Sequence, residues 1–381
     1  MLSFDKTNYF YFYNFQTGFV MYLALVIKIF GSHLIFLKIF EILFMSLTNV
    51  FVYKIASKVY TKKIGIISSI IYSLLFFNIA GSSIINNQHF STLLIILSIY
   101  FFIKDKWFYY ILSGTLVGIA NIIRPSSIII LIAFCGFLLW KLLINNFKNW
   151  KVFLLGFLLI ALSTFSTMKI FDYTLLNLNI VPTSTLSSNA KYFKFVLGIH
   201  GNGIYNIPTE TAEKTQVYFD LQKLNFDYEL YNNECKNFIV NKFTQNTKET
   251  FGHIKNKMLV FCGEEDNQIG FSGNKVQNSK SYIFIKYYGY VQYFLLIVFS
   301  LLTVIINVKE SKFYNTKNNL YQTQILFEIV FILYFCAHLL IEVQPRYRYD
   351  QYLMLAFIAS PSIYLLFSII SSKYNKKDKE V

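Results

Sequence analysis

Arginine is rare in this sequence, and its placement is the clearest chemical signal. The 381-residue chain has 35 Lys and Arg residues, but its only arginines are Arg124, Arg346 and Arg348. A guanidinium presents a planar fork of N–H donors that binds phosphate oxygens in pairs and keeps its charge. All three arginines follow apolar segments, so they are candidates for holding a phosphate group at a membrane surface. The alternative interpretation is that they reach ordinary lipid head groups.

The sequence EVQPRYRY, residues 342–349, places an acid and two of these arginines around a proline. Glu342 ends an apolar segment, Pro345 breaks the helix, and Arg346 follows Glu342 by four residues. We interpret Glu342 as a group that orients the Arg346 guanidinium toward a pocket. The alternative is an exposed pair at a helix end, which contributes little to stability.

Other polar residues carry weaker signals. Lys38 and Glu41 are three residues apart within an apolar segment, so they can neutralise each other on one helix face. A charge inside a membrane favours a functional hypothesis, but a structural pair explains these two equally well. His89 follows Asn86-Asn87-Gln88, and we interpret it as a loop residue rather than a base or ligand.

The chain opens with an aromatic run, YFYFYNFQTG over residues 9–18. Tyrosine and phenylalanine favour the membrane interface, which is one explanation. Aromatic rings also stack on sugar faces, and Gln16 can hydrogen-bond hydroxyl groups, so Tyr13 and Gln16 are candidates for sugar contacts. The run alone does not decide between these interpretations.

The composition identifies the elements that must position these residues. The chain is 55% apolar and 19% aromatic but only 14% charged, against roughly a quarter charged in soluble domains. The net charge of +15 lies largely in short loops between apolar runs, which argues against nucleic-acid binding. No spacing of the cysteines matches a metal template. The sequence therefore predicts an all-α polytopic membrane protein.

Nine apolar segments are long enough, or nearly so, to cross a hydrocarbon core of about 30 Å. They are residues 34–55, 64–80, 90–103, 107–123, 126–145, 151–171, 283–307, 321–342 and 351–371. Short Lys-rich loops alternate with short loops that lack lysine and with the long stretch 172–282, whose 11 lysines are balanced by 11 acids. Basic loops mark the cytoplasmic side. This pattern predicts an outer N-terminus and an inner C-terminus. Residues 17–30 are too short to span and are expected to lie in the outer interface.

Five regions follow from this topology. We expect an outer N-terminal segment (1–33), six transmembrane helices (34–171), an extracytoplasmic domain (172–282), three more transmembrane helices (283–371) and a cytoplasmic tail (372–381). Amphipathic periodicity predicts helices around 228–243 and 247–261, so the extracytoplasmic domain should be small and mostly helical.

Four stretches in this order resemble the GT-C superfamily of integral-membrane glycosyltransferases. The likeness is nearest to the dolichyl-phosphate-mannose protein mannosyltransferases, glycosyltransferase family 39 and its bacterial relatives. Residues 13–18 (YNFQTG) resemble the entry to that family's outer helix, and residues 118–127 (GIANIIRPSS) its Arg-Pro segment. Residues 198–260 resemble its outer loop, and residues 342–349 its late Glu-x-x-x-Arg-Tyr motif.

The resemblance implies a bundle of about nine transmembrane helices that transfers a sugar from a polyprenyl-phosphate donor, on the outer face, to an acceptor hydroxyl. An acid would take the proton, and Asp5 is the only acid near the start. It implies phosphate binding by Arg124 and Arg346, with Tyr13, Gln16, Glu342, Tyr347 and Arg348 as substrate contacts. No cofactor is implied with certainty, and the need for a divalent metal stays open.

The implied partners are membrane lipids, the lipid-linked sugar, and a cell-envelope glycan, glycolipid or protein acceptor, in a bacterial plasma membrane. In the family a further crossing and an acid-bearing loop precede the Gln-x-Gly entry. We therefore expect the DNA upstream of Met1 to encode an apolar segment and a loop with an aspartate. The alternative function is a non-catalytic protein that binds lipid-linked sugar or assists its transport.

Overall fold

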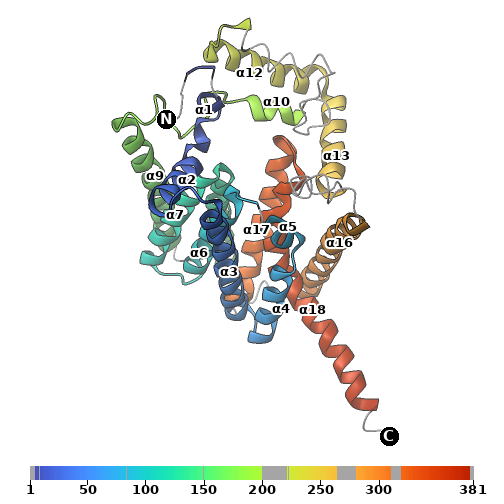
Figure 1. The fold of residues 1–381 in the computed structure, drawn as a ribbon. Helices are drawn as coiled ribbons and strands as arrows, with labels where there is room; N and C mark the ends of the chain where they lie inside the picture. The colour runs from blue at the N-terminus through green and yellow to red at the C-terminus, as the bar shows by residue number, and fades with distance from the viewer. Residues whose placement is uncertain are drawn as a thin grey trace.

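The computed structural model describes residues 5–7, 9–82, 84–148, 150–199, 221, 223–263, 280–309 and 319–377. Over these ranges the regular elements are α-helices and short 3-10 helices, without a β-strand. The all-α class expected from the sequence is confirmed (Figure 1).

Each of the nine apolar segments is helical. The helices are α3 (Leu34–Val59), α4 (Lys62–Ser73), α5 (Phe76–Gly81), α6 (Asn87–Phe102), α7 (Trp107–Ile123), α8 (Ile128–Ile144), α9 (Trp150–Asn177), α16 (Lys280–Lys309), α17 (Asn319–Leu340) and α18 (Tyr349–Lys377). The expected boundaries shift at three points, because α9 continues past 171, α16 begins before 283 and α18 extends into the expected tail.

The second apolar segment is broken into α4 and α5 at Leu74 and Leu75, although no proline or glycine marks the break. Gln292 of α16 holds it, because its side-chain amide donates to the Leu74 carbonyl (2.7 Å) and accepts from the Phe76 N–H (2.9 Å). Backbone groups freed inside a membrane need such partners, since lipid offers none.

Within the described ranges, six helices are long and apolar enough to cross a membrane by length and composition: α3, α8 with the preceding turn, α9, and most of α16, α17 and α18. A polytopic membrane protein is thereby confirmed. The shorter α6 and α7 have 16 and 17 residues, which at 1.5 Å per residue gives about 24–26 Å. Nine crossings therefore stay a prediction that depends on α4 to α7.

Small residues bring the bundle helices together. A Cβ on Gly114 of α7 would lie 2.4 Å from the Ile160 carbonyl oxygen of α9, and the Thr164 hydroxyl donates to the Gly114 carbonyl (3.0 Å). Close backbone approach at small residues drives helix association where the hydrophobic effect is weak. Aromatic packing fills the centre, as where Phe102 and Phe134 stack with ring centroids 4.0 Å apart.

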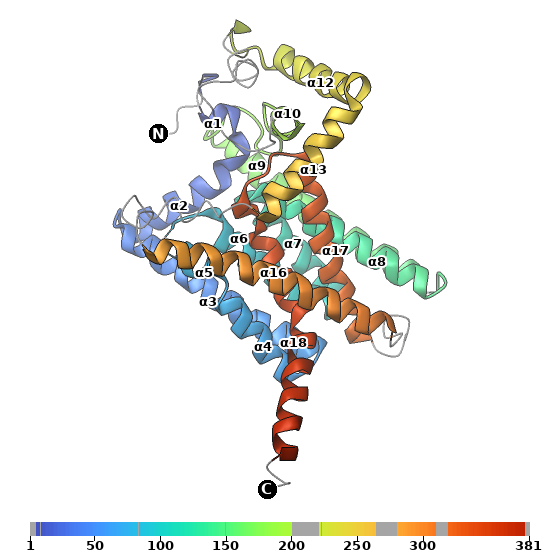
Figure 2. The same cartoon turned by 90° about the vertical axis from the view of Figure 1, so that its right-hand side faces the viewer.

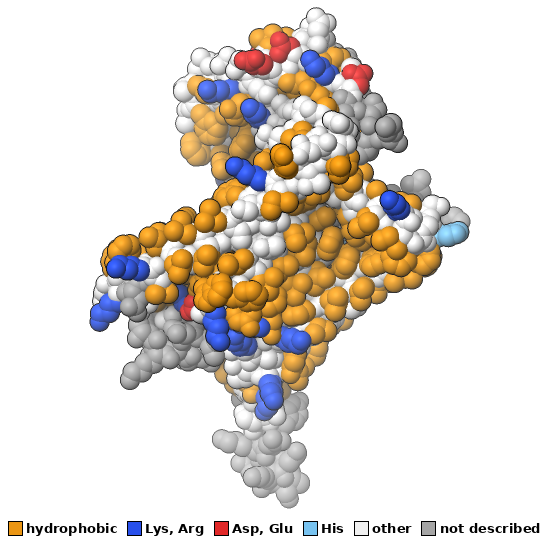
Figure 3. All heavy atoms as spheres, turned by 90° about the vertical axis from the view of Figure 1, so that its left-hand side faces the viewer, with side chains coloured by type: hydrophobic (Ala, Val, Ile, Leu, Met, Phe, Trp, Pro, Cys, Tyr) orange, Lys and Arg blue, Asp and Glu red, His pale blue; other side chains and the backbone are white. Residues whose placement is uncertain are grey.

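The bundle presents apolar side chains outward. Figure 3 shows them as a broad belt between a margin with lysines and a domain that carries both lysines and acids. Leu154, Leu162, Ile170, Phe284 and Phe294 are among the residues whose side chains are exposed. Large apolar surfaces of this kind mark contact with another apolar phase, here the membrane.

A helical domain, which we call the cap, covers one end of the bundle. It comprises α10 (Phe193–Ile199), α12 (Tyr228–Gln245) and α13 (Thr247–Gly263), with α1 (Tyr9–Phe12) and η1 (Asn14–Gln16) packed against it. The two helices expected near 228–243 and 247–261 are thus confirmed. Figures 1 and 2 both show the cap and the N-terminus at one end, and the C-terminus at the other, which we call the tail end.

Helix α2 (Thr17–Phe30) leads from the cap to the bundle. Its second residue, Gly18, packs so closely on α7 that a Cβ would lie 2.0 Å from the Ile122 carbonyl oxygen. The glycine of the Gln-Thr-Gly motif is therefore required by this backbone contact.

Replacing Gly114 with alanine should force α7 and α9 apart, because the new Cβ meets a backbone carbonyl. We expect the free energy of unfolding to fall by roughly 1–3 kcal/mol, as for other overpacked positions, measured by thermal unfolding of the purified protein in mild detergent. Gly252→Ala in α13 is the matched control, since no other atom lies within 4 Å of the place that its new Cβ would take. If Gly114→Ala unfolds at the same temperature as the wild type, then α7 and α9 pack less tightly than the Gly114 contact indicates.

Candidate functional site

Two proline-led turns lie at the cap end of the bundle; Arg124 directly precedes the first, and Arg346 and Arg348 belong to the second. The turn η2 (Pro125–Ser127) joins α7 to α8, and η3 (Pro345–Arg348) joins α17 to α18. Proline disfavours continuation of a helix because it lacks the N–H and its ring clashes with the preceding turn. Pro125 accordingly follows the end of α7 at Ile123, which places Arg124 at the edge of the bundle.

Arg124 forms a buried ion pair that the sequence did not predict. Its Nη1 lies 2.6 Å from Oδ2 of Asp350, and the side chains are 8% and 4% exposed. Asp350 also accepts from the Thr92 hydroxyl of α6 (3.3 Å) and lies in the first turn of α18, where the helix dipole favours a negative charge. The pair ties α7 to α18, so one face of the Arg124 fork is already occupied.

Arg348 also has contacts within the protein, whereas the Arg346 guanidinium is open, that is, without a carboxylate partner among the described residues. Arg348 is 3% exposed, donates to the Cys262 carbonyl (3.2 Å) and lies over the Tyr293 ring (5.5 Å). Arg346 is half-buried, with its guanidinium carbon 5.7 Å from the Tyr347 ring centroid. Among the described residues no carboxylate contacts Arg346, so its fork is available to a ligand.

Glu342 does not orient Arg346 as expected. Its carboxylate accepts from the Tyr347 hydroxyl (2.8 Å) and lies 3.5 Å from the Lys194 ammonium of α10. The four-residue spacing makes a pair only within a helix, but here the chain is extended at Gln344 (φ −132°, ψ 137°) before η3 begins. Glu342 and Tyr347 are brought together, and with Lys194 they join the bundle to the cap.

Lys257 completes this junction and was not identified from the sequence. It is fully buried, and its ammonium nitrogen donates to the carbonyls of Leu339 and Ile341 at 2.6 Å each. These are end carbonyls of α17 that lack a partner within the helix. Burial lowers the pKa of Lys257 to about 8, while the charge of Glu342 opposes that shift. The only signal in the sequence was its position in a Lys-rich helix.

The predictions for Glu41 and His89 were wrong. Lys38 is exposed, and Glu41 pairs instead with His89, with Oε2 2.6 Å from Nδ1 and both residues 1% exposed. His89 is in the first turn of α6, not in a loop, because the Asn86 side chain caps the helix (2.8 Å to the Gln88 N–H). The local spacing of Lys38 and Glu41 concealed a contact between residues 48 positions apart.

This pair leaves two buried polar atoms open. Glu41 Oε1 and His89 Nε2 have no hydrogen-bond partner among the described residues. Gln88 donates to the Arg346 carbonyl (2.9 Å), and the His89 ring lies 5.5 Å from that of Tyr349. The pair therefore lies beside the segment that carries the open guanidinium.

The remaining expected residues lie in the N-terminal segment. Tyr13 is buried in the apolar cluster of the cap, and the Gln16 side chain accepts from the Tyr9 hydroxyl (3.0 Å). Asp5 is exposed and accepts from the Thr7 hydroxyl (3.2 Å). The described contacts do not join these three residues to the arginines.

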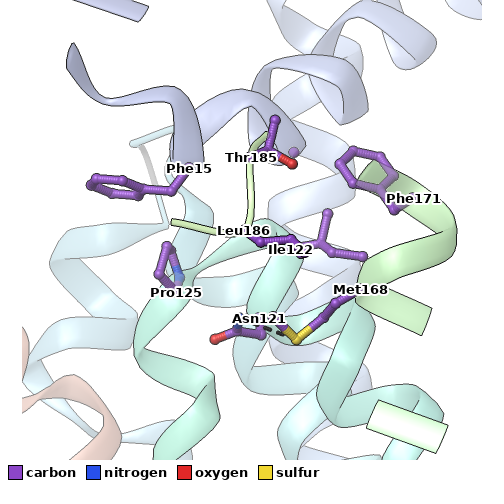
Figure 4. A pocket seen from close by; sticks show the side chains of 9 residues that line it. Phe15, Asn121, Ile122, Pro125, Met168, Phe171, Thr185 and Leu186 are labelled. Atoms are coloured by element: carbon purple, nitrogen blue, oxygen red, sulfur yellow. Dashed lines mark hydrogen bonds between the residues drawn. The ribbon is translucent and has the colours of Figure 1, made fainter. Parts of the chain in front are cut away.

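A small cavity separates the two N-terminal motifs that resemble the family. Figure 4 shows Phe15, Asn121, Ile122, Pro125, Met168, Phe171, Thr185 and Leu186 around it; Gly18 also lines it. Its volume of about 30 Å³ suits one water molecule rather than a sugar. Asn121 caps α8 there, accepting from the Ile128 N–H (3.0 Å), so this junction is structural.

Within the described ranges, no three His, Cys, Asp or Glu side chains gather as a metal ligand set would require. The sequence left a divalent metal open, and we assign it no residues.

Removing the carboxylate of Asp350 should destabilise the protein strongly, because Arg124 would stay buried without a counter-charge. We expect Asp350→Ala to lower the free energy of unfolding by about 3–5 kcal/mol, measured by thermal unfolding in detergent. The double variant Arg124→Leu/Asp350→Leu should recover most of that loss. If Asp350→Ala unfolds like the wild type, the ion pair does not hold α7 to α18.

Comparison with known proteins supports the resemblance seen in the sequence. Residues 18–171 match the family model of the dolichyl-phosphate-mannose-protein mannosyltransferases. Among solved structures, the chain is similar to an oligosaccharyltransferase of Archaeoglobus fulgidus crystallised in complex with Zn and sulfate. That likeness has 13% sequence identity and a TM-score of 0.49, and covers 95% of this chain.

The chain spans 42% of that archaeal chain, and comparison with curated proteins gives no match. The matched residues 18–171 run from α2 into α9 and include Glu41, His89 and Arg124. Over this range the resemblance to the mannosyltransferase branch of the GT-C membrane glycosyltransferases is confirmed.

Proposed function

We propose that the protein is a membrane glycosyltransferase that moves a sugar from a polyprenyl-phosphate donor to an acceptor hydroxyl. The observation that carries this proposal is the open Arg346 guanidinium, which lies where the cap meets a bundle matched to a mannosyltransferase family. A lipid-linked donor suits this position, since its chain can lie along the apolar belt while its phosphate reaches the cap end.

Phosphate binding is assigned chiefly to Arg346. The leaving phosphate gains negative charge in the transition state, and a donor fork already in place lowers the barrier. Arg348 is held by Cys262 and Tyr293 and adds positive potential nearby. The charge of Arg124 is offset by Asp350 at 2.6 Å, so Arg124 serves mainly to position η2 against α18.

For proton removal we favour the Glu41–His89 pair over Asp5. Asp172 accepts from Ser184 and Thr185, and Asp350 from Arg124, so these acids are occupied. His89 Nε2 is open, and Glu41 on Nδ1 stabilises the imidazolium that forms, as a carboxylate does in other histidine bases. Because His89 is 1% exposed, the acceptor reaches Nε2 only when the residues over it move aside.

The proposed step is balanced. The acceptor hydroxyl gives its proton to His89 Nε2, and its oxygen forms a bond to the anomeric carbon from the side opposite the donor phosphate. The bond between that carbon and the phosphate oxygen breaks, and the phosphate leaves with the electron pair. The configuration at the anomeric carbon is inverted.

We place the cap on the extracytoplasmic face of a bacterial plasma membrane. Lys58 donates to the Ile103 carbonyl (3.5 Å), which brings two of the Lys-rich loops together at the tail end, and basic loops favour the cytoplasm. The acceptor is a cell-envelope glycan, a glycolipid or a protein. The competing function is a non-catalytic protein that binds the lipid-linked sugar, which the burial of His89 favours.

Arg346→Lys should reduce turnover of a polyprenyl-phosphate sugar, because the charge stays but the paired donors are lost. Losing one charge-assisted contact costs about 1–3 kcal/mol, or roughly 5- to 150-fold in kcat/KM.

His89→Gln should lower kcat by roughly 100-fold or more, as loss of a general base does. The measurement is polyprenyl phosphate release by the purified protein in lipid vesicles, across a panel of labelled donors.

Two matched controls accompany this assay. Lys236→Met changes an exposed lysine of α12, and His33→Gln changes an exposed histidine before α3; both should turn over donor at the wild-type rate. Full activity of Arg346→Lys would contradict the phosphate assignment. Loss of activity in Asp5→Asn but not His89→Gln would make Asp5 the base. Donor binding without turnover by the wild type would establish the non-catalytic function.

The orientation is tested by cysteine labelling in a variant whose four native cysteines are replaced. Asn241→Cys in α12 should react with a membrane-impermeant maleimide in intact cells, because its exposed side chain lies on the cap. Ser372→Cys, exposed near the end of α18, should react only after permeabilisation. The reverse pattern would invert the topology.

A further inference from the structure

A second cavity lies at the tail end of the bundle, away from the proposed transferase site. Its volume is about 180 Å³, and it lies where α6, α7, α8 and α17 meet. The lining residues are Phe102, Ile103, Asp105, Tyr110, Phe137, Leu138, Lys141 and Thr323. An apolar cavity of roughly 150 Å³ accepts a benzene molecule, so this one has room for a ligand fragment.

Its polar lining includes an ion pair at the edge of the bundle. The ammonium of Lys141 lies 3.2 Å from Asp105 Oδ2; the Lys141 side chain is 13% exposed and that of Asp105 is 53% exposed. The Tyr110 hydroxyl donates to the other carboxylate oxygen. Asp105 has a left-handed backbone (φ 54°), a conformation that costs free energy unless contacts hold it. An ammonium has three N–H donors, and Asp105 takes one of those of Lys141.

The surroundings of this pair are strongly basic. Lys104 lies over the rings of Tyr100 and Tyr109, at 4.5 Å from each centroid, and Lys58 donates to the Ile103 carbonyl. Lys58 thus lies beside Ile103, which lines the cavity, and Lys104 directly precedes Asp105 in the chain. With these two lysines near the Asp105–Lys141 pair, we expect the remaining N–H donors of Lys141 to favour an anion.

Apart from Thr323, the rest of the lining is apolar. Phe102, Phe137 and Leu138 are buried, while Trp107 and Phe108, at the start of α7, are 64% and 56% exposed. Exposed aromatic side chains of this kind lie at the level of lipid head groups. The cavity therefore combines a cation, an apolar wall and the membrane interface.

We propose that this cavity binds an anionic phospholipid. The phosphate lies against the ammonium of Lys141, the glycerol and first chain carbons contact Phe102, Phe137 and Leu138, and the remaining chains lie on the membrane-facing surface. Charge complementarity selects an anionic head group over a zwitterionic one, because Lys58 and Lys104 add positive charge near the Asp105–Lys141 pair. This site is separate from the transferase site and requires no catalytic activity.

The test is lipid titration of delipidated, full-length protein by native mass spectrometry. We expect dioleoylphosphatidylglycerol to bind in a saturable way, and dioleoylphosphatidylcholine at least tenfold more weakly. Lys141→Met should weaken phosphatidylglycerol binding by roughly tenfold or more, as for a lost charge-assisted contact. Lys63→Met, an exposed lysine at the same end, should bind like the wild type.

A second variant distinguishes loss of the lipid site from loss of the fold. Leu138→Phe fills the cavity but leaves the Asp105–Lys141 pair intact, and it should also lose saturable binding while keeping its circular dichroism. Equal binding of both lipids, or wild-type binding by either cavity variant with an intact fold, would overturn the proposal. So would an equal rise in thermal stability with glycerol phosphate or inorganic phosphate, which would make this a site for soluble phosphate.

Discussion

The buried ion pair between Arg124 and Asp350 is the constraint on which the cap end of the bundle depends. A guanidinium and a carboxylate that are 8% and 4% exposed must stay together, because either one alone would be a buried, uncompensated charge. The pair fixes α7 and η2 against the start of α18. It thereby sets where η3 and the open Arg346 can lie, so the position of the proposed phosphate site follows from it.

The cap is held to this arrangement by polar contacts at the end of α17. Lys257 takes the carbonyls of Leu339 and Ile341, and Lys194 lies beside Glu342. The Lys257 contacts use carbonyls at the end of α17 that have no partner within the helix, so no hydrogen bond of the bundle is broken to form them. Because the same segment continues into η3, we expect a movement of the cap to displace Arg346 as well.

Hydropathy and periodicity were sufficient to predict the helices but not the site. All nine apolar segments are helical, and α12 and α13 lie where their apolar faces indicated, because both signals are local. The site is built from residues far apart in sequence, such as Arg124 with Asp350 and Glu41 with His89. Local spacing misled twice, since Lys38 does not pair with Glu41 and the extended chain before η3 separates Glu342 from Arg346. The break between α4 and α5 was missed because Gln292, in α16, stabilises it.

The range that matches the family model contains only one partner of the buried ion pair. Residues 18–171 match the mannosyltransferase model and contain Arg124, His89 and Glu41, but Asp350 and Arg346 lie outside that range. If Arg124 stayed buried without Asp350 of α18, the matched range would contain a guanidinium with no counter-charge, a state that costs several kcal/mol. The matched range therefore depends on a C-terminal helix for stability. The proposed phosphate ligand Arg346 and the proposed base His89 come from different parts of the chain, and the hydrogen bond from Gln88 to the Arg346 carbonyl brings these parts together.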